Sequence, residues 1–351
     1  MPKFLFFRFG QQFLLFAYVI TGYRLLAEEQ AVFFYDFVLM TTILTFAFSN
    51  ANNWLLKSED QSTYLQFQVL VAFFLSLIFI ALDKVEYIAY IPVMLLKSFS
   101  IVQLRIDNRV ILIPQFSMLF GVFNLLIIYC IYISVISFSI YYFFISNAVV
   151  GLLLFTGVNK RIILKKLTLY KLMEVTRYLP IVGAGFLAMN IDRLVIKKIF
   201  NPNELLVYAQ YEVVFQGILM LLLTVLFYYH KKVLVDEKIR QKFTAFDRYF
   251  FIALPILILI FGLFTKSALI LFDLNANLIV PLFFFKLTAI IISYYVIFFQ
   301  TNDKEVMFST SIVLIYCAIF ILIFFQYTSL AIAAIIAFIL ILGCIYIAKR
   351  I

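Results

Sequence analysis

The chain has 351 residues, of which 66% are apolar and only 13% are charged, about half the charged share of ordinary soluble domains. One soluble core of this length could not enclose so many apolar side chains, whereas a membrane-spanning helix needs roughly 20 of them. The composition therefore supplies about 11 to 12 spans. It excludes a secreted or cytosolic enzyme, a nucleic-acid binder and a disulfide scaffold.

Residues that commonly form bridges or bind metals are scarce. Cys130, Cys317 and Cys344 each lie in an apolar run, where cysteine behaves as a small hydrophobic residue. The one histidine in the sequence, His230, lies in a polar connection. Neither a histidine-based triad nor a His-rich metal site is therefore expected, and we expect no cofactor.

Apolar runs separated by polar clusters predict an all-α, polytopic transmembrane helical bundle of about 12 spans. Polar residues and Pro281 interrupt the run at 266–282, so a short outer connection followed by a span near 279–299 is expected there. Only Ser134 to Ser139 separates the fifth and sixth spans, which leaves a count of eleven open. In chain order the expected spans are 10–26, 32–50, 64–82, 86–104, 110–133, 136–157, 178–197, 204–229, 248–264, 268–299 (broken), 306–325 and 328–348.

The basic residues predict the orientation of the bundle. If the N-terminus is cytoplasmic, 20 of the 28 basic residues lie on the inner side and 6 on the outer side, while Lys97 and Lys286 lie within spans. This asymmetry follows the positive-inside rule, so both termini are expected in the cytoplasm. The net charge of +10 then reflects topology and not binding to nucleic acid. The six outer residues are Arg24, Lys84, Arg193, Lys197, Lys198 and Lys266.

The longest polar stretch follows the sixth span and divides the chain. We expect a six-helix bundle at 1–158, a basic amphipathic cytoplasmic linker at 159–177 and a second six-helix bundle at 178–351. A basic amphipathic segment of this kind lies well in the inner interface, near anionic lipid. A solvated linker is the alternative interpretation of the same residues.

The two halves share a weak pattern around their first connection. In each half a span ends in an Arg-Leu pair, a short acidic turn follows and an aromatic residue starts the next span. Arg24-Leu25-Leu26 closes the first span and is followed by Glu28-Glu29, while Gly10-Gln11 lies near the start of that span. Asn190-Ile191-Asp192-Arg193 closes the seventh span, and Glu204 through Tyr208 opens the eighth. Repeated halves around a central path are a common transporter plan. These residues resemble the polysaccharide (O-antigen type) flippases of the multidrug/oligosaccharidyl-lipid/polysaccharide exporter superfamily, in which twelve spans with both termini inside are also usual.

The resemblance implies a transporter of the bacterial inner (plasma) membrane that works by alternating access. Its expected cargo is a lipid-diphosphate-linked oligosaccharide, such as an O-antigen or capsule repeat unit, which it turns from the inner to the outer leaflet among the membrane lipids. Coupling to a proton or sodium gradient and cooperation with other polysaccharide-assembly proteins are further implications of the resemblance, which the residues themselves do not indicate.

Ionisable side chains inside spans cost several kcal/mol unless they are paired or face water, so they mark candidate functional positions. Cations suit a path for an anionic headgroup, and carboxylates can pair with those cations or carry protons. Interfacial snorkelling of the arginines and a local pair between Asp192 and Arg193 are the structural alternatives. The substrate-path candidates are Arg24, Lys97, Arg193 and Lys286, and the charge-pair or proton-coupling candidates are Asp36, Asp192 and Glu212.

Two other functions compete with the flippase. An integral-membrane glycosyltransferase or polysaccharide polymerase usually presents acidic residues in a large outer loop, and this sequence has no Asp-x-Asp and no long outer connection. A multidrug exporter of the same superfamily is closer, but it would favour acidic cavity residues, whereas Lys97 and Lys286 are basic. The flippase is therefore the preferred prediction, and the chain is not expected to be an enzyme.

Overall fold

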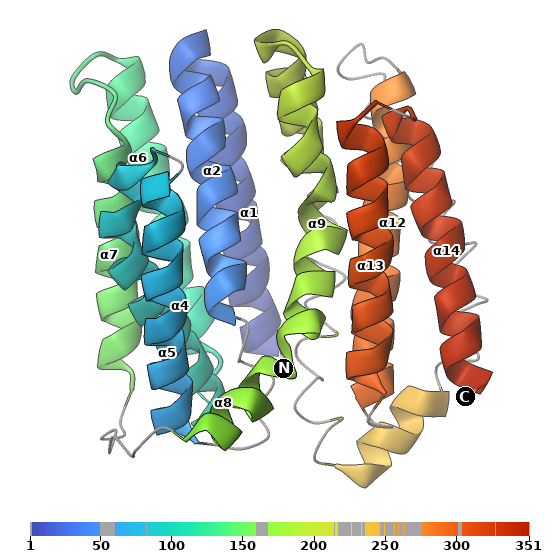
Figure 1. Ribbon diagram of the computed structural model, residues 1–351. Helices are drawn as coiled ribbons and strands as arrows, with labels where there is room; N and C mark the ends of the chain where they lie inside the picture. Colours follow the sequence, from blue (N-terminus) through green and yellow to red (C-terminus); the bar gives the residue numbers. More distant parts are fainter. Residues whose placement is uncertain are drawn as a thin grey trace. The chain divides into compact units, whose positions relative to one another are not determined.

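The computed structural model consists of helices joined by turns, with no strand among the residues that it describes (Figure 1). Contacts between residues divide the chain into two compact units, unit 1 at Met1–Val182 and unit 2 at Gly183–Ile351. The structure describes residues 2–49, 60–81, 83–107, 109–158, 168–213, 215–216, 226, 233, 236–245, 249, 256, 259, 263, 276–300, 304–326 and 328–350.

Long apolar helices confirm the all-α membrane fold class. Within the described ranges, eight helical stretches are long and apolar enough to cross a membrane, and Ile140–Thr156 is a shorter apolar helix. The eight stretches are Glu28–Phe48, Gln61–Ala81, Val85–Ile106, Leu112–Tyr132, Leu169–Ile196, Ile279–Gln300, Glu305–Phe324 and Leu330–Arg350. The expected ninth span and the second half of the eighth fall mainly outside the described residues.

Several helix boundaries differ from the sequence prediction. Helix α1 (Pro2–Leu25) begins well before residue 10, with Pro2 in its first turn, where proline fits. Helix α2 (Glu28–Ser49) includes Glu28 and Glu29 in its first turn, where carboxylates offset the helix dipole. The stretch expected as an acidic turn is thus a helix start. Helix α12 (Ala276–Gln300) continues through Pro281 and covers the span expected near 279–299.

Unit 1 contains α1, α2 and the helices that follow them in the first half of the chain. Helix α1 packs against α6, and α5 packs against α7, with α2 and α4 also touching α5. The remaining elements of this unit are α4 (Gln61–Ala81), the 3-10 helix η1 (Val85–Tyr90), α5 (Ile91–Ile106), α6 (Leu112–Tyr132), α7 (Ile140–Thr156) and α8 (Leu169–Thr176).

A glycine allows the close approach of α1 and α6. A Cβ atom added to Gly121 would lie 2.7 Å from the Leu14 Cβ and 3.0 Å from the Leu14 backbone carbon. Backbone atoms cannot move aside as a flexible side-chain end can. Small residues at such crossings let membrane helices gain van der Waals contact, so Gly121 fixes how closely this helix pair packs.

We expect Gly121→Ala to destabilise the protein by about 1–3 kcal/mol, the usual cost of overpacking a tight core. Gly343→Ala is the matched control, because no atom lies within 4 Å of a Cβ added at that helical glycine. Its expected effect is neutral or a gain of about 0.5–1 kcal/mol from better helix propensity. Thermal unfolding of the two detergent-purified variants measures the difference, and equal melting temperatures would contradict the tight crossing.

Aromatic rings form much of the core of unit 1. Phe143 of α7 lies with its ring centroid 5.3 Å from that of Phe34 and 5.2 Å from that of Phe37, both on α2. Tyr90 of η1 stacks on Phe144 of α7 at 4.4 Å with the ring planes 9° apart. Such pairs add to the gain from apolar burial, so these rings join α2, η1 and α7.

Helix α8, which covers most of the described part of the expected linker, belongs to unit 1 and packs against α4. Lys171 forms an ion pair with Asp60, which precedes α4, and Val175 is buried in a cluster with Tyr64 and Phe99. Burial alone would raise the pKa of the Asp60 carboxyl, but hydrogen bonds from Lys171 and Thr63 outweigh it and lower this pKa. The helix therefore has a fixed contact with the bundle.

In unit 2, helix α12 contacts both of the last two helices, and these two also contact each other. Residues 279–300 of α12 are largely buried in the molecule, which marks α12 as a central element of this unit. The other named helices here are α9 (Leu179–Ile199), most of which belongs to unit 2, α13 (Glu305–Phe324) and α14 (Leu330–Arg350).

Candidate functional site

A capping box begins the helix that follows α9. The Glu204 backbone N–H donates to Asn201 Oδ1 at 2.9 Å, and the Asn201 N–H donates to Glu204 Oε2 at 3.3 Å. This reciprocal pair satisfies helix N-terminal donors, and Pro202 occupies the first helical position, where proline is favoured. The helix is described over 202–213 and 215–216. Its start places Tyr208 and Glu212, four residues apart, on one face.

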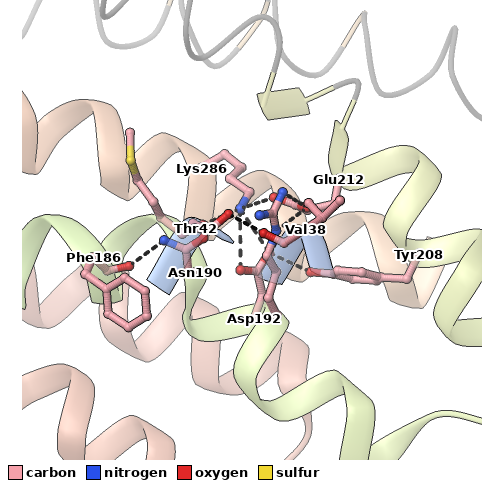
Figure 2. Close-up of polar contacts among 10 residues, drawn as sticks. Val38, Thr42, Phe186, Asn190, Asp192, Tyr208, Glu212 and Lys286 are labelled. Carbon is pink, nitrogen blue, oxygen red and sulfur yellow. Dashed lines mark hydrogen bonds and ion pairs between the residues drawn. The ribbon is translucent and has the colours of Figure 1, made fainter. Parts of the chain in front are cut away.

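Lys286 of α12 lies among oxygen atoms of α9 and of the 202–216 helix. Its ammonium donates a hydrogen bond of 2.7 Å to the Met189 carbonyl and one of 3.4 Å to Asp192 Oδ1. Lys286 Nζ also lies 3.2 Å from Asp192 Oδ2 and 2.8 Å from Glu212 Oε1. Figure 2 shows the Lys286 side chain reaching toward Asp192 and Glu212, with Tyr208 directed at Asp192. The sequence distance between Lys286 and Asp192 is 94 residues.

The neighbouring side chains complete a charge-balanced group. Arg193 donates from Nε to Glu212 Oε2 at 2.5 Å, and its Nη2 lies 2.5 Å from the same oxygen. The Tyr208 hydroxyl donates to Asp192 Oδ2 at 2.9 Å. We call Asp192, Arg193, Glu212 and Lys286 the unit-2 tetrad. It contains two cations and two carboxylates, so its formal charges cancel.

Burial makes these ion pairs interdependent. Lys286 and Asp192 are 0% exposed, Glu212 is 1% exposed and Arg193 is 7% exposed. In surroundings of low dielectric, an unpaired ion costs several kcal/mol, and breaking one pair exposes its partner to that cost. The tetrad therefore holds α9, the 202–216 helix and α12 together as long as all four charges are present.

Lys97 of α5 has a different environment in unit 1. Its ammonium donates a 2.7 Å hydrogen bond to Asn147 Oδ1 of α7 and lies 4.7 Å from the ring centroid of Phe120 of α6. No carboxylate forms an ion pair with Lys97 within the described part of the chain. An amide and an aromatic face contact this ammonium without cancelling its charge.

Uncharged polar groups lie beside this lysine. Ser146, next to Asn147, donates to Asn124 Oδ1 at 2.7 Å. The Asn124 side-chain Nδ2 is buried and has no hydrogen-bond acceptor among the described residues, which is a costly state for an amide. We call Lys97, Phe120, Asn124, Ser146 and Asn147 the Lys97 cluster. It combines one cation, hydrogen-bonding amides and an aromatic face.

The structure separates the seven site candidates into groups. Asp192, Arg193, Glu212 and Lys286 meet in the unit-2 tetrad, and Lys97 lies in unit 1. Arg24 is exposed in the last turn of α1, and Asp36 is buried on α2. Arg193, by contrast, lies six residues before the end of α9. The two Arg-Leu pairs thus occupy different places on their helices, and the expected parallel between the halves is inexact there.

Two groups that contact the tetrad were not among the candidate residues identified from the sequence. Tyr208 donates to Asp192, and Met189 contributes a backbone carbonyl. The spacing of Tyr208 and Glu212 at i and i+4 was a usable signal for the first. The second has no sequence signal, because every residue carries a carbonyl. Adjacent Asp192 and Arg193 have different partners, since neighbouring helix positions point in different directions.

A comparison with known proteins identifies the fold that this arrangement of helices forms. No protein-family model and no curated protein sequence matches the chain. The structure is similar to a crystal structure of MATE in complex with Br-NRF, with a TM-score of 0.54 and 14% sequence identity, over 99% of this chain and 95% of that chain. The fold is that of a MATE transporter. The MATE-like fold agrees with the apolar helices in describing a multi-pass membrane protein, and the similar structure is a transporter and not an enzyme.

Proposed function

We propose that this chain is a membrane transporter that flips a lipid-diphosphate-linked oligosaccharide from the inner to the outer leaflet of a bacterial plasma membrane by alternating access. A MATE-like fold over 99% of the chain supports transport. The flippases that the sequence resembles belong to the same superfamily as MATE transporters. The proposed cargo rests on the chemistry of the Lys97 cluster, together with that resemblance.

The observation that carries the proposal is the uncancelled charge of Lys97. An ammonium inside an apolar bundle is costly unless something pairs with it or it faces water. The contacts of Lys97 with Asn147 and Phe120 leave its positive charge available to an anion. A diphosphate supplies that anion, and amides and an aromatic ring suit the attached sugars. In the unit-2 tetrad, by contrast, an anionic cargo would have to compete with Asp192 and Glu212 for Lys286 and Arg193.

Lys97→Gln is expected to lower surface polysaccharide about tenfold or more in a flippase-deficient host that the unaltered chain complements. Losing one charge-assisted hydrogen bond costs about 1.5–3 kcal/mol, and 1.4 kcal/mol is about a tenfold effect. Immunoblotting of the surface polysaccharide, normalised to the amount of protein in the membrane, measures this loss.

Two control variants isolate the charge. Lys97→Arg retains a cation and is expected to keep most of the activity. Lys84→Gln removes a lysine from the same unit, at the start of η1, and is expected to have little effect. Full complementation by Lys97→Gln at normal protein levels would overturn the role of Lys97. Failure of the unaltered chain in hosts that produce several different glycans would overturn the flippase proposal.

A multidrug exporter is the second candidate, because the structurally similar protein is a MATE in complex with Br-NRF. This candidate predicts that the chain lowers the susceptibility of a drug-sensitive host to several unrelated compounds. It also predicts that Lys97→Gln leaves resistance to cationic compounds intact, since a cation does not help to bind another cation. The two assays in parallel separate the two functions.

A further inference from the structure

Asn147 of α7 gives the Lys97 ammonium an uncharged partner. Lys97 Nζ donates to Asn147 Oδ1 at 2.7 Å, and Asn147 Nδ2 donates to the Phe143 carbonyl at 3.4 Å. Together these bonds define which end of the amide faces the ammonium, because only the amide oxygen accepts a hydrogen bond. Asn147 is 0% exposed, so water does not replace this acceptor.

The same part of α7 lets the Lys97 side chain approach closely. Gly151 lies one helical turn after Asn147, and a Cβ atom added to Gly151 would lie 3.7 Å from the Lys97 Cβ. The Lys97 side chain therefore begins beside Gly151 and ends at Asn147. The packing of α5 on α7 thus places the side chain at position 147 directly against the ammonium.

The chemistry of position 147 sets the net charge of the Lys97 cluster. An amide accepts the hydrogen bond from Lys97 and leaves the cluster with one positive charge, since its other members are also uncharged. An aspartate has nearly the same shape as an asparagine, but its carboxylate would form a buried ion pair with Lys97. The cluster would then be neutral and would no longer attract an anion.

We propose that Asn147 determines the sign of the charge on the cargo that the transporter accepts. It holds the ammonium in place without cancelling its charge, so an anion is accepted and a cation is repelled. A carboxylate at this position would remove the preference for anions, and a carboxylate without Lys97 would reverse it. This inference rests on the proposed function and names the residue of the Lys97 cluster that sets its specificity.

Binding of an anionic probe to the detergent-purified protein is the first test. Farnesyl diphosphate is the probe, and calorimetry measures its dissociation constant, which is expected to be measurable for the unaltered chain. Asn147→Asp is expected to weaken this binding by about tenfold or more, the effect of losing one charge-assisted contact. Asn147→Ser keeps an uncharged acceptor and is expected to stay within about threefold of the unaltered chain.

A cationic probe tests the reversed charge. Lys97→Gln combined with Asn147→Asp gives the cluster one negative charge, so this double variant is expected to bind tetraphenylphosphonium about tenfold or more tightly than the unaltered chain does. Lys97→Gln alone leaves a neutral cluster and is expected to show no such gain. The double variant is purified with tetraphenylphosphonium present, because a bound ligand stabilises the folded state.

Three binding results would overturn the role of Asn147. These are unchanged binding of farnesyl diphosphate by Asn147→Asp, an equal loss in Asn147→Ser, and no gain in tetraphenylphosphonium binding by the double variant. Failure of the double variant to fold with tetraphenylphosphonium present would also overturn it. If the unaltered chain does not bind farnesyl diphosphate, the diphosphate cargo is wrong, and the cationic probe alone then decides the role of Asn147.

Discussion

Glu212→Leu is expected to lower the free energy of unfolding by about 3–5 kcal/mol, the cost of removing one partner from a buried ion pair. The reason is that Glu212 contacts both cations of the unit-2 tetrad, Arg193 at 2.5 Å and Lys286 at 2.8 Å. Its loss removes the carboxylate that both of these buried cations contact. Thermal or denaturant unfolding of the detergent-purified protein measures the effect.

A second substitution tests whether charge balance is the cause. Adding Arg193→Met to Glu212→Leu leaves Lys286 and Asp192, whose charges cancel, and buried ion pairs can often be replaced by apolar residues at little cost. The double variant is therefore expected to regain much of the lost stability. Glu237→Leu is the matched surface control, because its pair with Arg240 is exposed and worth about 0–1 kcal/mol. A double variant less stable than Glu212→Leu alone would contradict the argument from charge.

Hydropathy predicted the spans because crossing a membrane requires about 20 apolar residues in a row. The expected spans 64–82, 306–325 and 328–348 lie within about three residues of α4, α13 and α14. The method was weaker at the first two helices. There Arg8 and Glu28 interrupt the apolar sequence without ending the helices. Polar residues extend a helix beyond the hydrocarbon, where hydropathy no longer reports on it.

The sequence could not predict which apolar faces meet. Lipid tails are as apolar as a protein interior, so an aromatic residue has the same hydropathy whether it faces lipid or another helix. From the sequence alone, the 44 Phe and 22 Tyr residues are expected to be mainly lipid-facing and interfacial bulk. Phe34 and Phe37, however, are fully buried against α7, while Phe33 beside them is exposed. Only the packing of helices separates these neighbours.

The candidate site was predictable residue by residue but not as an assembly. The high cost of a charge within a span was enough to single out Asp192, Glu212 and Lys286 without any structure. Their meeting point depends on how α12 packs against α9, across 94 residues of sequence, and no local pattern encodes that packing. The contrast between a cancelled charge at Lys286 and an uncancelled one at Lys97 likewise appears only when the helices are assembled.

Phe143→Ala is expected to cost about 3–5 kcal/mol, the usual range for truncating a buried phenylalanine. Its ring is 0% exposed and joins α7 to two rings of α2, so its removal leaves a cavity between these helices. Phe73→Ala on α4 removes the same atoms from a side chain that is 58% exposed, where lipid can fill the space, and is expected to cost less than about 1 kcal/mol. Unfolding of both variants in the same detergent measures the difference. Equal losses would mean that the rings of α2 and α7 do not hold these helices together.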